Sequence, residues 1–226
     1  AIYVGVCVKV APYLKLNPLA FNFGILSEIY KFVTYGALGG IAAVVQFQLA
    51  KLIISYFLGL RYLTYYDLGQ RLIFAMTGLL GSIATTIMPA ASAIYASLGV
   101  KKVKEVFQTT FKYVTLISIP AFLFTSVMAD RIIFVWLGTG YEKTAFVLRF
   151  LSIAYLILLL TGPGAMILTG MGQFEIPFYG SILTAVISVV LSLILVGKFG
   201  LTGIIISTLV AYSCSAIYGL YYSQKK

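Results

Sequence analysis

The 226-residue chain contains no histidine and only six acidic residues, and charged residues occupy just 10% of its positions. The absence of histidine excludes a Ser-His-Asp triad, a histidine-ligated metal site and a histidine proton shuttle. Six carboxylates spread over the whole length offer little material for a carboxylate metal site or for a pair of catalytic acids. We therefore expect no catalytic residues, no metal site and no cofactor, and hence no enzyme activity.

Cysteine is almost as scarce, since Cys7 and Cys214 are the two cysteines of the chain. They lie in apolar surroundings, far apart in the sequence, and match neither a CxxC motif nor a zinc-ligand spacing. The sequence therefore predicts neither a zinc site nor a disulfide framework.

Apolar residues, in contrast, are abundant. They make up 61% of the chain, and the mean hydropathy is +1.03, whereas soluble domains are about 45–50% apolar and roughly 25% charged. A water-soluble fold of this size could not bury so much apolar surface. Polar residues do not alternate with apolar ones as they do in a membrane β-barrel. The composition thus predicts an all-α polytopic membrane protein.

Six apolar windows come close to the length of about 20 residues that crosses a bilayer. The expected spans are residues 32–59, 72–98, 113–129, 150–170, 176–197 and 199–223. Lys51 interrupts the first of them. We expect residues 32–226 to form one six-helix transmembrane lobe.

Residues 1–31 are expected to hold the tail of a preceding helix followed by a cytoplasmic connector. The opening stretch AIYVGVCV is apolar but too short to span, and it has neither an initiator methionine nor the basic region of a signal peptide. Prolines, asparagines and lysines mark the connector. We therefore expect the chain to be the C-terminal part of a longer protein.

The net charge of +10 predicts anionic partners, either membrane lipids or an anionic substrate. Nucleic acid is not expected, because the charges are scattered between apolar runs. Nine lysines fall in the connector, the loop at residues 101–112 and the C-terminal tail, against six basic residues in the opposite loops. This bias predicts a plasma-membrane protein with both termini of the chain in the cytoplasm.

The segment KKVKEVFQTTFK at residues 101–112 has one apolar helical face edged by lysines. The members of that face are spaced as on a helix: Val103, Val106, Phe107, Thr110 and Phe111. Two interpretations stay open. The segment is either an amphipathic helix on the cytoplasmic membrane surface beside anionic lipid, or an ordinary positively charged loop.

Lys51 is the candidate site residue that the sequence singles out, because a lysine at the centre of a span costs about 2.5–3.5 kcal/mol. Gln48 and Ser55 lie three residues before and four residues after it, so the three form a polar stripe on one helical face. One hypothesis is that this stripe lines a central cavity and that Lys51 attracts an anionic substrate. The alternative is that Lys51 snorkels to the interface or pairs with a carboxylate outside this chain.

Three arginines are further candidates for substrate binding. Arg149 is expected to begin a span and to face the mouth of the cavity. Arg61 and Arg71 flank an expected outer loop and are weaker candidates, because charges in such loops are ordinarily solvated.

From about Ile29 onward, the chain resembles the second half of Wzx-type polysaccharide flippases. The resemblance rests on five stretches in the family's order and at about its spacing: KLIISYFLGLRYLTYYDLGQRL, IMPAASAIYASLG, SIPAFLFTSVMADRIIFVWLGTGYEKTAFVLRFLSIAY, GMGQFEIPF and KFGLTGIIISTLVAY. One position departs from the pattern. Many relatives have an acidic residue just before the lysine of the seventh helix, where this chain has Ala50, so we expect Lys51 to lack that neutralising partner.

The resemblance implies membership of the multidrug/oligosaccharidyl-lipid/polysaccharide exporter (MOP) superfamily, whose members have two six-helix lobes around a central cavity. This chain would be the second lobe, and its partner would be the missing N-terminal lobe of the same protein. The implied function is a flippase that works by alternating access. It would carry polyprenyl-pyrophosphate-linked oligosaccharides across the plasma membrane for O-antigen, capsule or exopolysaccharide synthesis.

Two alternatives within the same fold stay open, a lipid II flippase and a multidrug extruder coupled to H⁺ or Na⁺. Ion coupling generally needs a carboxylate inside the membrane. All six acidic residues are expected in connectors or at helix ends: Glu28, Asp67, Glu105, Asp130, Glu142 and Glu175. This expectation argues against the extruder.

Overall fold

The computed structural model describes residues 23–85 and 87–224, and over these residues it is entirely helical. The helices are α2 (Phe23–Phe57), α3 (Leu60–Thr85), α4 (Ile87–Val127), α5 (Ala129–Leu137), α6 (Glu142–Gly170), α7 (Glu175–Phe199) and α8 (Leu201–Gln224). The prediction of an all-α fold is confirmed. The expectation for the N-terminal tail falls mostly on residues 1–22, outside the described residues.

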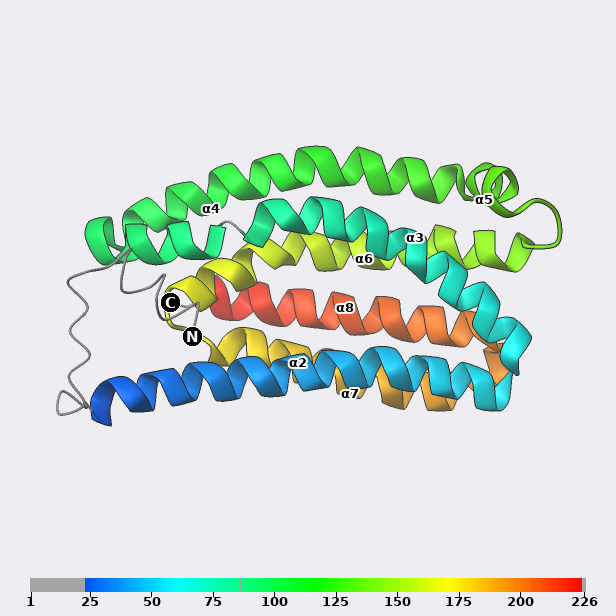
Figure 1. Ribbon diagram of the computed structural model, residues 1–226, viewed down its shortest axis with the longest axis horizontal. Helices are drawn as coiled ribbons and strands as arrows, with labels where there is room; N and C mark the ends of the chain where they lie inside the picture. The colour runs from blue at the N-terminus through cyan, green and yellow to red at the C-terminus, as the bar shows by residue number, and fades with distance from the viewer. Residues whose placement is uncertain (1–22, 86, 225–226) are drawn as a thin grey trace, which may run out of the picture.

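The long helices run along the length of the molecule between two ends (Figure 1). The turns after α2 and after α7 lie at one end, here called the Gly59 end, together with α5. The turn between α6 and α7 lies at the opposite end, here called the Gly99 end. Gly59 and Gly200 have φ angles of +90° and +56°, a conformation that glycine adopts without steric cost, so each chain reversal falls at a glycine.

Five helices are long and apolar enough to cross a membrane: Ile29–Phe57, Lys101–Val127, Glu142–Gly170, Glu175–Phe199 and Leu201–Tyr222. The remaining expected span, residues 72–98, lies in two helical segments, the later part of α3 and the start of α4. The segments extend in the same direction towards the Gly99 end, where the chain turns back (Figure 1). This reversal occurs at Gly99, whose φ of 75° and ψ of −176° interrupt the helix.

The loop interpretation of residues 101–112 is wrong, because the segment forms the first turns of a membrane-length helix. The helix of the other interpretation is confirmed, whereas its place on the membrane surface stays a prediction. Val103 is buried in a small apolar cluster with Ala91 and Ile167, and Phe107 packs against that cluster. The apolar face therefore meets protein at Val103 and Phe107, whereas Phe111 is exposed. Lys101, Lys102 and Lys104 are exposed around it.

Two expected connecting segments are also helical. The outer loop expected at residues 60–71 is the first half of α3, because only Leu58 and Gly59 separate α2 from α3. Residues 23–31, expected in the connector, are the first turns of α2. Polar and charged residues lower the hydropathy of a segment and therefore suggest a loop. They are nevertheless compatible with a helix that packs against other helices.

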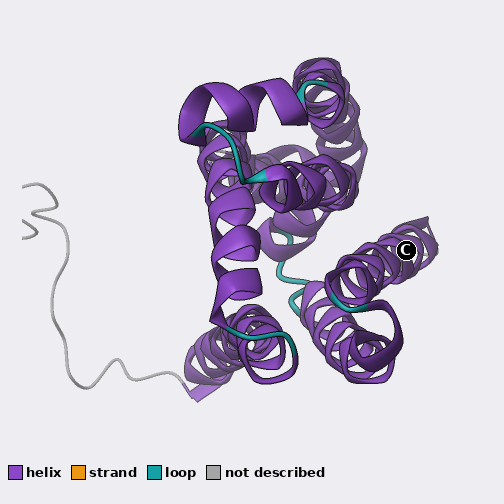
Figure 2. Ribbon diagram, turned by 90° about the vertical axis from the view of Figure 1, so that its right-hand side faces the viewer, coloured by secondary structure: helices purple, strands orange, loops and turns teal. Residues whose placement is uncertain are grey.

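Helix α6 lies at the centre of the packing and contacts α3, α4 and α8, whereas α7 packs against α8 and α2. Seen from the Gly59 end, α3 crosses the bundle obliquely while the other long helices are viewed nearly along their axes (Figure 2). A close approach between α3 and α6 is set by Gly69, because a Cβ atom there would lie 2.9 Å from Cγ1 of Val147. Because α3 crosses obliquely, polar residues of its first half lie against α2 and α6. These residues form the candidate site.

Candidate functional site

The side chain of Lys51 forms an ion pair with Asp67. Its Nζ atom donates a hydrogen bond to Oδ1 of Asp67 at 2.5 Å. The lysine side chain is 30% exposed and the aspartate side chain is 24% exposed. Both charges are thus largely removed from the surface of the lobe, so each reduces the desolvation cost of the other.

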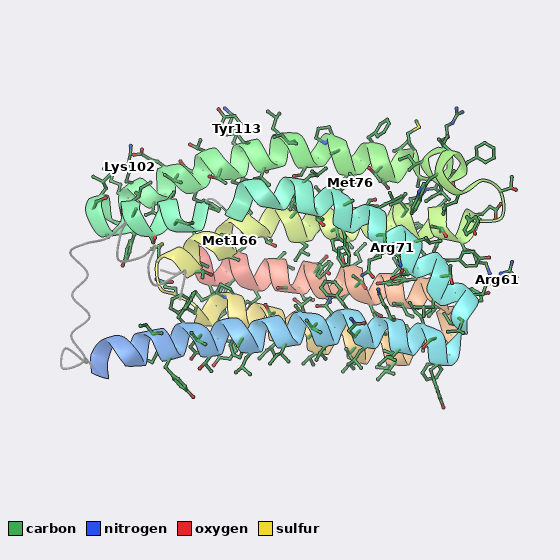
Figure 3. All side chains as sticks on the ribbon, in the orientation of Figure 1. Arg61, Arg71, Met76, Lys102, Tyr113 and Met166 are labelled. Atoms are coloured by element: carbon green, nitrogen blue, oxygen red, sulfur yellow. The ribbon has the colours of Figure 1, made fainter. Side chains whose placement is uncertain are left out.

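Arg71 adds a second cation to the same carboxylate. Its Nε atom donates to Oδ2 of Asp67 at 2.8 Å, one helical turn along α3. The arginine side chain is 71% exposed, and it lies part-way along α3 (Figure 3). Lys51, Asp67 and Arg71, here called the charge cluster, carry one net positive charge, because two cations share one carboxylate.

The charge cluster lies well inside the helices rather than at their ends. At about 1.5 Å per residue, Lys51 is roughly 9 Å from the end of α2 at Phe57, and Asp67 is roughly 10 Å from the start of α3 at Leu60. Arg71 is about 16 Å from that start by the same measure. Positions 51 and 67 are equally far in sequence from Gly59, the turn between the two helices, which explains why they meet.

Two expectations about acidic residues are corrected by this geometry. Lys51 has a neutralising partner within this chain, Asp67. It is therefore neither an unpaired cation nor the partner of a carboxylate outside this chain. Asp67 lies inside α3 rather than in a connector. Asp67 therefore departs from the expectation that all six acidic residues lie in connectors or at helix ends.

The other members of the predicted polar stripe do not join the cluster. The hydroxyl of Ser55 donates to the carbonyl oxygen of Leu52 at 2.9 Å, within its own helix. Gln48 is exposed on α2, one turn from Lys51.

Arg61 and Arg149 lie apart from the charge cluster. Arg61 is at the Gly59 end (Figure 3), where its Nε atom donates to the hydroxyl of Tyr65 at 2.8 Å. Arg149 pairs with Asp130, and its Nε atom donates to the carbonyl oxygen of Ser126 at 3.4 Å. It therefore ties α6 to the junction between α4 and α5.

A layer of buried polar side chains lies on the core side of α2 and α3. Gln46, Tyr66, Gln70, Tyr155 and Tyr212, here called the tyrosine–glutamine cluster, are each at most 6% exposed. Nε2 of Gln70 donates to the hydroxyl of Tyr155 at 3.4 Å. The rings of Tyr155 and Tyr212 pack edge to face with centroids 5.5 Å apart. Since Tyr66 and Gln70 flank Asp67 and Arg71 along α3, this packing fixes the helix that carries two members of the charge cluster.

The residues of this site are suited to holding an anion rather than to catalysing a reaction. Within the described part of the chain, no group of three or more acidic, cysteine or histidine residues is placed to hold a metal ion. Lysine and arginine side chains bind phosphate groups well, and arginine adds a planar set of donors.

Sequence reasoning found Lys51 but missed Asp67 as its partner, and it also missed the tyrosine–glutamine cluster. A signal for the pair was present, because positions 51 and 67 are equidistant from a glycine turn and Arg71 follows Asp67 at the helical spacing of four. No comparable signal marks Tyr155 and Tyr212, which are distant in sequence and meet only when α6 packs on α8.

Comparison with known proteins places this geometry in context. The pattern of the family described as "Polysaccharide biosynthesis protein" matches residues 2–146. An uncharacterized membrane protein of Methanocaldococcus jannaschii is 20% identical over 218 residues, which are 96% of this chain and 43% of that protein.

Two solved structures share the fold. A MOP superfamily transporter from Pyrococcus furiosus, described as having a binding pocket of reverse polarity that suggests a different function, superposes with a TM-score of 0.78 at 14% identity. A multidrug resistance MATE family transporter in an outward-facing conformation superposes with a TM-score of 0.72 at 16% identity. Each match covers 86% of this chain and 44% of the other. The chain thus spans less than half the length of the relatives it matches.

Proposed function

Because this chain belongs to the polysaccharide biosynthesis protein family and shares the fold of MOP superfamily transporters, we propose that it is one lobe of a flippase for polyprenyl-pyrophosphate-linked oligosaccharides. The observation that carries this proposal is the charge cluster of Lys51, Asp67 and Arg71. Charged side chains within a membrane are costly, and they commonly mark a substrate pathway. The pyrophosphate of a lipid-linked sugar is an anion that the two cations would hold.

The placement of the cluster also suits a path between two lobes. Arg71 is the most exposed member and lies about 16 Å along α3, where a charged side chain that faced lipid tails would be costly. We infer that this face of α2 and α3 lines a cavity shared with a second, N-terminal lobe. The sugar headgroup would occupy that cavity while the polyprenyl tail stays in the bilayer, and the lobes would rock to open it alternately to each side.

A multidrug extruder is the second candidate function, because Asp67 provides a carboxylate within a helix that ion coupling requires. The electrostatics of the cluster favour the flippase. Asp67 is already held by Lys51 and Arg71, and the cluster retains one net positive charge. A cationic drug would be repelled from such a site, whereas an anionic headgroup would be attracted.

The remaining partners and the orientation follow from the same proposal. The exposed lysines beside Gly99, including Lys102 and Lys104, would lie near anionic lipid headgroups of the cytoplasmic leaflet. Both termini of the chain would then be cytoplasmic and the Gly59 end external. Labelling Thr139→Cys from outside intact cells with an impermeant maleimide tests this orientation, and labelling only after permeabilisation would refute it.

Transport in proteoliposomes tests the substrate class. The protein expressed from its complete reading frame should flip undecaprenyl pyrophosphate N-acetylglucosamine, measured as accessibility of the sugar to an external enzyme, and it should not move ethidium. Flipping above that of protein-free vesicles supports the proposal. Ethidium export driven by an imposed H⁺ or Na⁺ gradient, without flipping, would establish the extruder instead.

A further inference from the structure

Asp67 joins two cations that are otherwise the natural ligands of a phosphate group. One of its oxygens accepts from Lys51 at 2.5 Å and the other accepts from Arg71 at 2.8 Å. A carboxylate and a phosphate offer similar oxygen acceptors to these donors. Asp67 therefore occupies the positions that an anionic substrate would need.

The charges of the cluster make simultaneous occupation unfavourable. A pyrophosphate diester carries a negative charge on each phosphate, which Lys51 and Arg71 together would balance. With Asp67 still between them, the site would hold surplus negative charge in a region where screening is weak. The carboxylate would also lie against the phosphate, and like charges at such a distance repel each other.

The exposed fractions of the three side chains are consistent with a ligand displacing Asp67, rather than with permanent ion pairs between Asp67 and the two cations. Arg71 is 71% exposed and can turn towards a ligand without unpacking the core, while Lys51 at 30% and Asp67 at 24% remain within reach of the surface. Below them, the tyrosine–glutamine cluster is buried and keeps α3 in place.

We propose that Asp67 is a built-in competitor of the anionic substrate: it holds Lys51 and Arg71 in the empty lobe and yields them to the pyrophosphate on binding. This inference rests on the flippase function proposed above. Its consequence is that Asp67 weakens binding of the anion and speeds its release. A transporter needs such a balance, because a substrate that binds two free cations too tightly is not released on the far side.

Substitution of Asp67 tests this role. The protein from its complete reading frame is placed in nanodiscs, and its affinity is measured for inorganic pyrophosphate and for undecaprenyl pyrophosphate N-acetylglucosamine. Asp67→Asn should bind both ligands more tightly, by about tenfold or more, as expected when a close charge pair is removed. It should also flip the lipid more slowly, because release becomes limiting. Asp67→Glu keeps the charge and should stay near the wild-type affinity.

Glu105→Gln is the matched control. Glu105 pairs with Lys102 near the Gly99 end, so its neutralisation removes a carboxylate from a lysine without touching the charge cluster. Its affinity for pyrophosphate should equal that of the wild type. An equal gain in affinity for both variants would show a general effect of net charge and overturn the inference.

A double variant separates competition from folding. In the Lys51→Met background, Asp67→Asn should raise the affinity less than it does in the wild type, because one of the competed cations is gone. An unchanged or weaker affinity of folded Asp67→Asn would overturn the competitor role while leaving the flippase proposal intact. If the wild-type protein binds neither ligand, the proposed function itself fails, and this inference fails with it.

Discussion

At the scale of the residue, the hydroxyl of Tyr212 is buried beside the Tyr155 hydroxyl and the Gln46 amide, and no described group makes a well-aligned hydrogen bond to it. The side chain is 3% exposed and packs edge to face on Tyr155. A buried hydroxyl that makes no hydrogen bond loses its water contacts without compensation. Tyr155 differs from it, because its hydroxyl accepts a hydrogen bond from Gln70.

Two phenylalanine substitutions therefore have different expected effects. Tyr155→Phe leaves the Nε2 group of Gln70 unpaired in the core and should lower the free energy of unfolding by about 1–2 kcal/mol. Tyr212→Phe removes a hydroxyl that makes no well-aligned hydrogen bond, so the midpoint of thermal unfolding in detergent should fall less than it does for Tyr155→Phe. A Tyr212→Phe variant as unstable as Tyr155→Phe would mean that the Tyr212 hydroxyl does make a stabilising hydrogen bond.

Lys51 could be identified from the sequence because a single charged residue in an apolar run stands out without knowledge of the fold. Asp67 could not be identified, because the loop expected at residues 60–71 placed that carboxylate outside the membrane. The error came from treating charged residues as loop signals, whereas Lys51, Asp67 and Arg71 neutralise one another within two helices. Which charges pair depends on the angle at which α3 crosses α2, and a hydropathy pattern does not contain that angle.

At the scale of the element, α7 and α8 approach closely where the chain reverses at Gly200. A Cβ atom on Gly203 would lie 2.6 Å from the carbonyl oxygen of Leu195, which is a backbone atom and cannot turn aside. Gly197 lies nearby in α7, but a Cβ atom there would meet nothing within 4 Å. The two glycines thus have opposite roles within one helical hairpin.

Alanine substitution should distinguish these two positions. Gly203→Ala forces α8 away from α7 and should cost roughly 1–3 kcal/mol of stability, as overpacking does. Gly197→Ala should be neutral or stabilising by about 0.5–1 kcal/mol, since alanine favours a helix over glycine. Thermal unfolding of both variants in the same detergent measures the difference, and equal destabilisation would contradict the close approach at Gly203.

The sequence predicted the elements more fully than their boundaries. Five of the six apolar windows correspond to helices of membrane-spanning length, because hydropathy over about 20 residues depends little on packing. The connections were harder to predict. A run of lysines suggested a loop or a surface helix at residues 101–112, yet the reversal needs only Gly99, and the apolar face of the run packs on α6 through Val103 and Phe107.

At the scale of the whole molecule, the chain has the fold of one half of a MOP superfamily transporter. Large apolar side chains remain exposed along its length, for example Val135 at 85%, Leu60 at 73% and Ile217 at 68%. Such a surface requires lipid or a protein partner. The account proposed here assigns the face that carries the charge cluster to the partner lobe and to the substrate between the lobes.

In the proposed function, Lys51 and Arg71 hold the anionic headgroup during transport. The most direct measurement is the rate at which undecaprenyl pyrophosphate N-acetylglucosamine is flipped in proteoliposomes by the protein from its complete reading frame. Lys51→Met and Arg71→Gln are compared with Lys51→Arg and with Lys198→Met, which removes an exposed lysine at the end of α7. The account predicts a loss of at least about tenfold for the first two variants, as expected when a charge-assisted contact is removed. Lys51→Arg should keep part of the activity and Lys198→Met should keep all of it. Wild-type flipping by both Lys51→Met and Arg71→Gln would contradict the account.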